Sequence, residues 1–128
     1  MQRVAFVMRV KDGEQREYIH RHQTVWPEVL ADLRRAGVHK MSIFLKGTEL
    51  FLYMEVEDYA QAVRILEQSP ESQRWEAFMA PIMEDANGND YDPANAYPNG
   101  LPEVFAWDRT LQPTGKSADL SGQRTPQS

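Results

Sequence analysis

Hydrophobic and polar residues alternate in three segments of the chain, which predicts three β-strands. The first segment covers residues 3–11, and its apolar side chains share one face: Val4, Phe6, Met8 and Val10. The other two, residues 38–46 and 49–57, flank the turn sequence KGTE and predict a hairpin. A run near the end of the chain, residues 101–108 (LPEVFAWD), predicts a short fourth strand.

Helical patterns fill the intervals between these strands. Residues 14–23 predict one helix and residues 27–36 a second, because a proline such as Pro27 fits the first turn of a helix and disrupts its interior. After the hairpin, Asp58 and Ser69 each offer an N-cap side chain. They predict two further helices: residues 59–67 and 71–83.

The order strand, helices, strand, strand, helices, strand predicts an α+β fold of the ferredoxin-like, split βαβ type. Its antiparallel sheet carries the helices on one face. The hairpin strands place Phe44, Phe51 and Tyr53 on the opposite face, where no element of this chain remains to cover them. A second copy of the chain is the simplest cover, so we expect a homodimer, a dimeric α+β barrel, formed through the open sheet face.

Two segments lie outside this pattern. Residues 84–100 are rich in Asn, Asp, Pro and Gly and predict a loop. Loops of this length in small domains are commonly functional covers or disordered. Residues 109–128 are polar and nearly lack large apolar side chains, which predicts a flexible C-terminal tail. We therefore expect one folded domain over residues 1–108.

Composition narrows the range of functions. The chain has 128 residues, a net charge of −5 and no cysteine. Without cysteine it has no disulfide, no thiolate zinc site and no cysteine nucleophile. The acidic balance, without any basic run, argues against nucleic acid and anionic membranes as partners. No apolar run is long enough for a signal peptide or a membrane span, so we expect a cytoplasmic protein.

Tyr18 and His22 are the first candidates for a reactive pair. They are four residues apart on the first predicted helix and therefore lie side by side. An imidazole gives and takes protons near neutral pH, and a neighbouring phenol can donate a hydrogen bond or assist as an acid. The alternative is an amphipathic pair that packs its rings and keeps its polar ends in water. His20 points away from His22 and is expected at the surface, and His39 is expected to be a structural histidine.

Three other residues have both a structural and a binding interpretation. Trp75 is typical of a core, and also of the aromatic surfaces on which sugars pack. Glu76 is typical of a solvated carboxylate, or of a group that binds sugar hydroxyls, and Met41 is typical of a side chain that fills gaps in a core. No metal-ligand spacing, phosphate-binding loop or dinucleotide fingerprint is present, so we expect no metal and no cofactor. Proton transfer on a small molecule is the chemistry that remains.

Five stretches of the chain together resemble the L-rhamnose mutarotase family: AFVMRV, EYIHRHQTVWPEVL, GVHKMSIFL, SQRWEAFM and LPEVF. The resemblance runs in register over about residues 2–105. The pattern Y-x-x-x-H-x-x-x-W-P-E, which starts at Tyr18, is a specific signature when it is joined to QRW and EVF. The resemblance implies a dimeric α+β barrel that interconverts the α and β anomers of a free monosaccharide, a deoxysugar, without a cofactor.

The resemblance also implies roles for individual residues. His22 matches the proton donor of the family, which protonates the ring oxygen, and Tyr18 matches a substrate-contacting tyrosine that assists acid/base chemistry. Trp75 matches the first of two adjacent aromatic residues that contact the sugar. Glu76 stands where the family usually has a second tryptophan, and Met41 where it has a sugar-contacting tyrosine. These departures alter the wall of the expected pocket, so L-fucose is an alternative to L-rhamnose as the substrate.

Two other functions fit the same architecture. A cofactor-free or haem-using monooxygenase of the dimeric-barrel type would use His22 as a base or an axial ligand. A sugar-binding or regulatory module would bind its ligand through Tyr18 and Trp75 without turnover.

Overall fold

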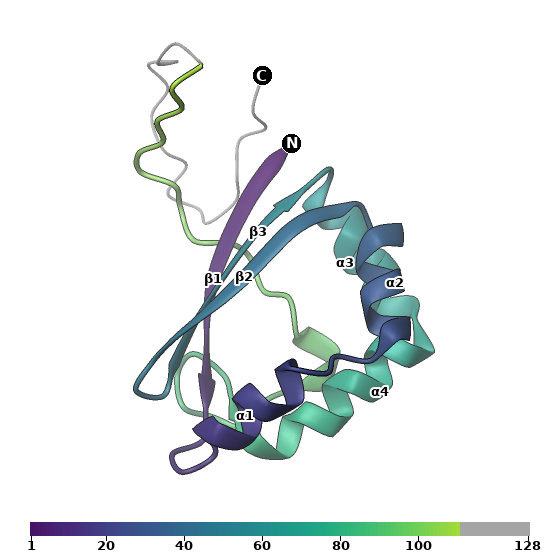
Figure 1. Ribbon diagram of the computed structural model, residues 1–128, viewed down its shortest axis with the longest axis vertical. Helices are drawn as coiled ribbons and strands as arrows, with labels where there is room; N and C mark the ends of the chain where they lie inside the picture. The colour runs from purple at the N-terminus through teal and green to yellow at the C-terminus, as the bar shows by residue number, and fades with distance from the viewer. Residues whose placement is uncertain (111–128) are drawn as a thin grey trace.

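Four antiparallel strands form one curled sheet in the computed structural model, which describes residues 1–110 (Figure 1). The strands are β1 (Gln2–Val10), β2 (Val38–Lys46), β3 (Glu49–Val56) and β4 (Met83–Glu84). Their spatial order is β2-β3-β1-β4. The two outer positions of the sheet are thus held by the strands that follow the two helical segments. This is the split βαβ topology that the order of elements predicts.

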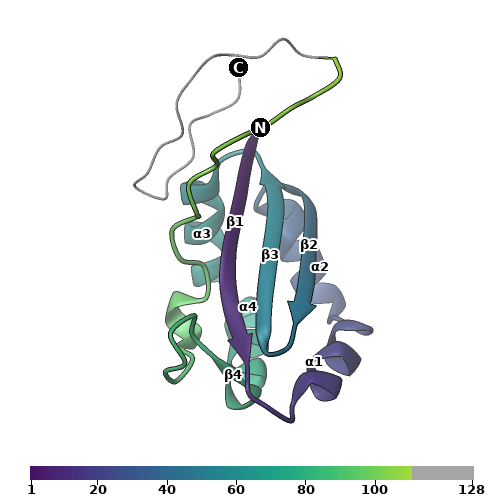
Figure 2. The same cartoon turned by 90° about the vertical axis from the view of Figure 1, so that its left-hand side faces the viewer.

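Four α-helices lie on one face of the sheet, as Figures 1 and 2 show from two directions. They are α1 (Gln15–His22), α2 (Pro27–Arg35), α3 (Tyr59–Gln68) and α4 (Pro70–Met79). Two short 3-10 turns follow α4: η1 (Ala80–Ile82) and η2 (Pro93–Asn95). The predicted α+β class, with an antiparallel sheet and helices on one face, is confirmed.

The alternating pattern of β1 and β3 determines which sheet face packs against the helices. Their inward side chains are buried: Val4, Phe6, Met8, Val10, Leu50, Leu52, Met54 and Val56. In register, Phe6 lies opposite Leu52 and Val4 opposite Met54. On β2 the corresponding residues Met41 and Ile43 are only partly buried. The space in front of β2 is therefore not completely filled by the helices.

Prolines and capping side chains set the helix boundaries. Pro27 occupies the first turn of α2, which separates α2 from α1 as the sequence predicts. The side chains of Asp58 and Ser69 accept hydrogen bonds from backbone N–H groups at the start of α3 and α4. The helix predicted over residues 71–83 ends earlier, at Met79, because Pro81 has no N–H and its ring does not fit a helix interior.

The fourth strand is not where the sequence predicts it. The structure places β4 at Met83–Glu84, where it pairs with the end of β1, and residues 101–108 form no strand. This segment runs beside β1 (Figure 2), held by one backbone bond from the Leu101 N–H to the Ala5 carbonyl at 2.7 Å. The Arg3 guanidinium also binds the Glu103 carboxylate through two hydrogen bonds of 3.0 Å. Pro102 provides no N–H to continue a ladder beyond Leu101.

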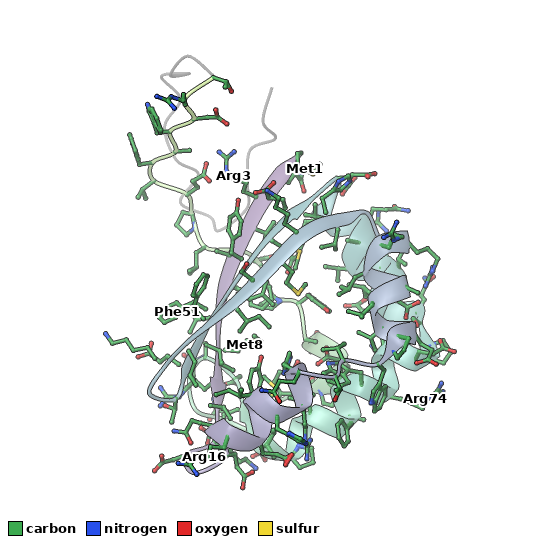
Figure 3. All side chains as sticks on the ribbon, in the orientation of Figure 1. Met1, Arg3, Met8, Arg16, Phe51 and Arg74 are labelled. Carbon is green, nitrogen blue, oxygen red and sulfur yellow. The ribbon has the colours of Figure 1, made fainter. Side chains whose placement is uncertain are left out.

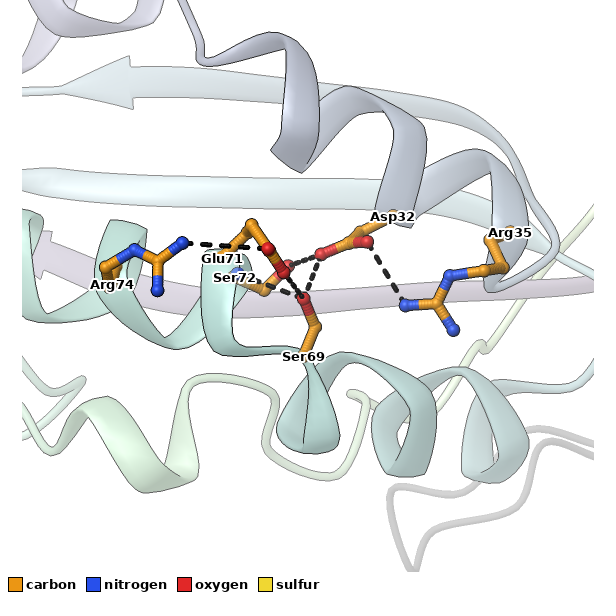
Figure 4. Close-up of polar contacts among 6 residues, drawn as sticks. All are labelled: Asp32, Arg35, Ser69, Glu71, Ser72 and Arg74. Atoms are coloured by element: carbon orange, nitrogen blue, oxygen red, sulfur yellow. Dashed lines mark hydrogen bonds and ion pairs between the residues drawn. The ribbon is translucent and has the colours of Figure 1, made fainter.

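A buried polar network ties α2 to α4 (Figure 4). The Asp32 carboxylate is almost fully buried and accepts hydrogen bonds from the Ser69 hydroxyl and, at 2.7 Å, from the Ser72 hydroxyl. Arg35 binds its second oxygen at 3.1 Å. Buried carboxylates are stable only when they are paired in this way. The network fixes the start of α4, which carries Trp75 and Glu76 one turn further along.

The face of the sheet opposite the helices carries exposed apolar side chains. Phe44 and Phe51 are 64% and 39% exposed, and Figure 3 shows Phe51 on the side of the sheet away from the helices. The segment that runs beside β1, residues 101–108, also exposes large apolar side chains: Val104, Phe105 and Trp107. Within residues 1–110, no helix is both long and apolar enough to cross a membrane. The polar segment predicted over residues 109–128 lies almost entirely outside the described residues, so its expected flexibility stays a prediction.

Candidate active site

A cavity of about 550 Å³ lies between the sheet and the helices, a volume typical of small-molecule sites. Side chains from β1, β2, β3, α1, α2, α4 and the loop after α4 line it. All five residues that the sequence singles out are among them: Tyr18, Met41, His22, Trp75 and Glu76. Ile19, Leu30 and Leu45 line the cavity and are also exposed, so it opens between α1, α2 and β2.

The Tyr18 and His22 rings are stacked on one face of α1. Their centroids are 4.2 Å apart and the planes differ by 24°. Tyr18 is buried, and its hydroxyl makes no hydrogen bond to another of residues 1–110. Burial, with a further contribution from the charge of Glu76, raises the pKa of Tyr18 far above its ordinary value. The phenol therefore stays neutral near neutral pH and can donate a hydrogen bond to a bound molecule.

The local hydrogen bond of His22 selects one tautomer. Nδ1 lies 3.0 Å from the backbone carbonyl of Tyr18, which can only accept, so Nδ1 carries a proton. Nε2 is then the nitrogen available to a ligand. Burial lowers the pKa of His22, although the bond to the Tyr18 carbonyl partly opposes this shift. A neutral imidazole with an unprotonated Nε2 is thus favoured near pH 7, and this atom accepts a proton.

An aromatic cluster holds α1 against α4. The His22 ring meets Trp75 edge to face at 5.5 Å, and Trp75 contacts Trp26 at 5.2 Å in the same manner. Phe78 packs against both tryptophans, and the Arg21 guanidinium lies 4.0 Å from the centre of its ring. Arg21 also donates a 2.7 Å hydrogen bond to the Phe78 carbonyl. These contacts fix the position of His22 relative to Trp75.

Glu76 faces the cavity and is hydrogen-bonded to the loop. Its carboxylate accepts a 2.6 Å hydrogen bond from the Tyr91 hydroxyl. Burial raises the pKa of Glu76, and the Tyr91 hydrogen bond opposes this shift by stabilising the carboxylate. Neither lysine nor arginine lines the cavity, and no ion pair to Glu76 occurs within residues 1–110. Glu76 therefore does not fit the first of its two sequence interpretations, a carboxylate solvated at the surface.

The loop after β4 forms part of the cavity wall, which the sequence left open. Tyr91, Ala96 and Tyr97 from this loop line the cavity. Tyr97 also packs edge to face on Phe6 of β1 at 6.2 Å. The sequence interpretation did not assign either tyrosine a role in the site. Their signal was present, because two large aromatic side chains in a loop of Asn, Asp, Pro and Gly require a surface to cover.

Two of the three histidines lie outside the cavity wall. His20 is exposed on the opposite side of α1, as its position relative to His22 predicts. His39 is exposed and its Nε2 lies 2.6 Å from the Glu57 carboxylate, consistent with a structural contact. Among residues 1–110, no group of three or more His, Asp or Glu side chains is placed to hold a metal ion.

The cavity thus combines the proton-accepting Nε2 of His22, three tyrosine hydroxyls and the carboxyl group of Glu76 with a tryptophan ring and an apolar wall. Seen against known proteins, the family model described as L-rhamnose mutarotase matches residues 3–107 of this chain. The chain belongs to the L-rhamnose mutarotase family.

Individual mutarotases show how close the relationship is. The L-rhamnose mutarotase of Oceanobacillus iheyensis is 37% identical over 110 residues, which cover 84% of this chain and all of that protein. The L-fucose mutarotase of Xanthomonas campestris pv. campestris is 40% identical over 86 residues, or 62% of this chain and 69% of that protein. The crystal structure of L-rhamnose mutarotase FA22100 from Formosa agariphila superposes with a TM-score of 0.64 at 28% identity, covering 84% and 100% of the two chains.

Proposed function

We propose that this protein is an isomerase that interconverts the α and β anomers of a 6-deoxy aldose, L-rhamnose or L-fucose, within the cavity around His22. The match to the L-rhamnose mutarotase family over residues 3–107 carries this proposal. The family match favours neither the monooxygenase nor the non-catalytic binding module. The cavity adds support because its polar groups are those that ring opening of a hemiacetal needs: a proton acceptor, a proton donor and hydroxyl contacts.

His22 is proposed as the central acid/base residue. Ring opening removes the proton of the anomeric hydroxyl while the ring oxygen gains one. With Nδ1 held by the Tyr18 carbonyl and a lowered pKa, the resting imidazole presents an unprotonated Nε2. We infer that Nε2 first takes the anomeric proton and then donates it back when the ring closes on the other face of the aldehyde. This order reverses the first half of the role that the sequence alone suggested, in which His22 begins as the acid.

Tyr18 and Trp75 are proposed to orient the sugar. The Tyr18 hydroxyl makes no hydrogen bond among the described residues and stays protonated, so it can donate to a sugar oxygen. Trp75 contributes an aromatic surface, and its contact with His22 fixes the distance between the packing surface and the reactive nitrogen. Positioning of this kind lowers the barrier because reacting groups meet in a productive geometry.

The apolar wall supports a 6-deoxy sugar as the substrate. Met41 and Ile43 of β2 and the leucines beside them give the cavity many more carbon than polar contacts. A 6-deoxy sugar has a methyl group where an ordinary hexose has a hydroxymethyl group, and burying the extra hydroxyl without a partner has a free-energy cost. Met41 and Glu76 stand where the family has other residues, so we propose that they set the preference between L-rhamnose and L-fucose.

We further propose that the enzyme is a homodimer and that it works in the cytoplasm. The exposed phenyl rings on the open sheet face support the dimer, because contiguous exposed apolar side chains are typical of interfaces. The cytoplasmic location rests on the sequence expectation, and fractionation of cells that produce the protein tests it.

Saturation-transfer NMR on the anomeric protons tests the function. Added protein is expected to accelerate exchange between the anomers of L-rhamnose or L-fucose far above the spontaneous rate. The matched controls are L-mannose and L-galactose, which differ from these sugars by the 6-hydroxyl group and should exchange roughly 10–100-fold more slowly. Exchange of no deoxysugar above the spontaneous rate would overturn the proposal.

A further inference from the structure

Glu76 and Tyr91 form a hydrogen-bonded polar pair in the wall of the cavity. The Tyr91 hydroxyl donates to Glu76 Oε2 at 2.6 Å, and both side chains line the cavity. The other titratable groups that line this cavity are Tyr18 and His22 from α1 and Tyr91 and Tyr97 from the loop, and the charge of Glu76 acts on the three tyrosines. The three long strands add only apolar side chains to the wall, and no lysine or arginine of the described residues lines it.

Among residues 1–110, His22 and Glu76 are therefore the only groups in the cavity wall that titrate below the range of tyrosine. Glu76 directly follows Trp75, and the Trp75 ring contacts His22. The charge of Glu76 also raises the pKa of Tyr18, whose ring stacks on His22. The two groups thus border one ligand-sized space. Anomerisation needs two proton-transfer groups, and His22 supplies only one of them.

We propose that Glu76 is a second catalytic residue, the acid that acts with His22, and that Tyr91 is a positioning residue that holds the Glu76 carboxyl group. This inference rests on the proposed mutarotase activity. It differs from the expectation that Glu76 only binds sugar hydroxyls, and it assigns a role to the loop.

The proton transfers balance over one cycle. His22 Nε2 takes the proton of the anomeric hydroxyl, the O–H electron pair forms the C1=O double bond, and the C1–O5 bond breaks. O5 takes the proton of the Glu76 carboxylic acid, which leaves an open-chain aldehyde, an imidazolium and a carboxylate. After rotation about C1–C2, O5 attacks the other face of C1, returns its proton to Glu76, and the carbonyl oxygen takes the proton from His22. Enzyme and sugar regain their protons, and only the configuration at C1 changes.

The raised pKa of Glu76 supports this role because a carboxyl group that keeps its proton nearer to neutral pH is a better acid there. The lowered pKa of His22 supports the complementary role of base. The Tyr91 hydrogen bond stabilises the carboxylate that forms when Glu76 gives up its proton.

The decisive experiment compares anomer-exchange kinetics of the wild type with Glu76→Gln. Glutamine keeps the size of the side chain and an oxygen that accepts the Tyr91 hydrogen bond, but it cannot transfer a proton. We expect kcat to fall by about 10²–10⁴-fold with little change in KM. Glu67→Gln, the same change at an exposed position on α3, should leave kcat unchanged.

The pH profile separates catalysis from a structural role. The two limbs of the wild-type profile report the coupled titration of His22 and Glu76, and Glu76→Gln should remove one of them. Tyr91→Phe removes the hydrogen bond that stabilises the carboxylate, so the limb that Glu76 dominates should move to higher pH. If Glu76→Gln does not fold, the shift of this limb to higher pH in Tyr91→Phe tests whether Glu76 transfers a proton.

Each other outcome overturns the inference. If the wild type exchanges a deoxysugar and Glu76→Gln matches its kcat, Glu76 transfers no proton. A higher KM with unchanged kcat would assign Glu76 to binding alone. If the pH profile of folded Tyr91→Phe matches that of the wild type, the hydrogen bond between Tyr91 and Glu76 only anchors the loop. If the wild type exchanges no deoxysugar, the proposed function itself falls, and this inference with it.

Discussion

Side-chain spacing explains why separate residues meet in one cavity. Tyr18 and His22 share a helix face, and Met41 shares a strand face with Ile43, so periodicity predicted which of these side chains lie side by side, and the family resemblance predicted their roles. All five predicted site residues line the cavity. Tyr91 and Tyr97 were missed because a loop has no periodicity that relates sequence position to direction. Only contacts far apart in the sequence, such as Tyr97 with Phe6, place them.

The protonation state of His22 can be measured without substrate. Burial lowers its pKa, so the ring should titrate with a midpoint below the ordinary value of about 6.5. A histidine with a lowered pKa is neutral above that midpoint and gains a proton only as the pH falls through it. Long-range ¹H–¹⁵N spectra should show the tautomer with the proton on Nδ1 at neutral pH. A midpoint above 6.5, or a proton on Nε2, would contradict the proposed base.

At the scale of elements, two prolines account for the differences between prediction and structure. Strand and helix positions followed from alternation, helical spacing and caps. Pro81 ends α4 before the predicted Met83, which frees Met83 to pair with β1 as β4. Pro102 stops residues 101–108 from extending the sheet, although their composition is typical of a strand. A propensity pattern does not reveal which of two segments pairs with the free edge of β1.

The Asp32 network should make stability depend on pH. Hydrogen bonds from Ser69 foremost, and then from Ser72 and Arg35, lower the pKa of Asp32 in the folded state. The stabilisation is therefore complete above the unfolded value of about 3.9 and is lost as the pH falls through the lower folded value. Asp32→Asn should reduce the free energy of unfolding by about 1–3 kcal/mol at pH 7.

Urea denaturation of the wild type and of Asp32→Asn at several pH values measures this difference. The gap between the two proteins should narrow below about pH 3.9, as Asp32 itself becomes protonated. Comparing the two proteins at each pH cancels the titration of the other carboxylates. An equal gap at pH 7 and at the lowest accessible pH would show that the charge of Asp32 does not contribute.

At the scale of the whole molecule, the sheet separates two surfaces with different roles. Its inner face and the helices enclose the cavity, and its outer face presents Phe44 and Phe51 to solvent. In register, these two rings lie opposite each other on β2 and β3, with Val7 of β1 next to Phe51. The apolar side chains thus form a continuous row across three strands, the arrangement expected of a face that packs against another sheet.

Removing this row should separate the proposed dimer. Each buried phenyl ring contributes on the order of 1.5–3 kcal/mol, so Phe44→Ser combined with Phe51→Ser should give a monomer at micromolar concentration. Sedimentation velocity measures the change. Phe78→Ser is a matched control, since Phe78 is 41% exposed on the helical layer, and it should remain dimeric. A wild type that sediments as a monomer would contradict the dimer outright.

The central claim is that the cavity around His22 interconverts sugar anomers. Saturation transfer between the anomeric protons of L-rhamnose and of L-fucose, measured with the wild type, His22→Ala and His20→Gln, tests it most directly. We predict rapid exchange for the wild type and for His20→Gln, whose altered side chain lies exposed on the other side of α1. His22→Ala should keep its fold and lose about 10²–10⁴-fold of the rate. Exchange by folded His22→Ala as fast as by the wild type would contradict the claim.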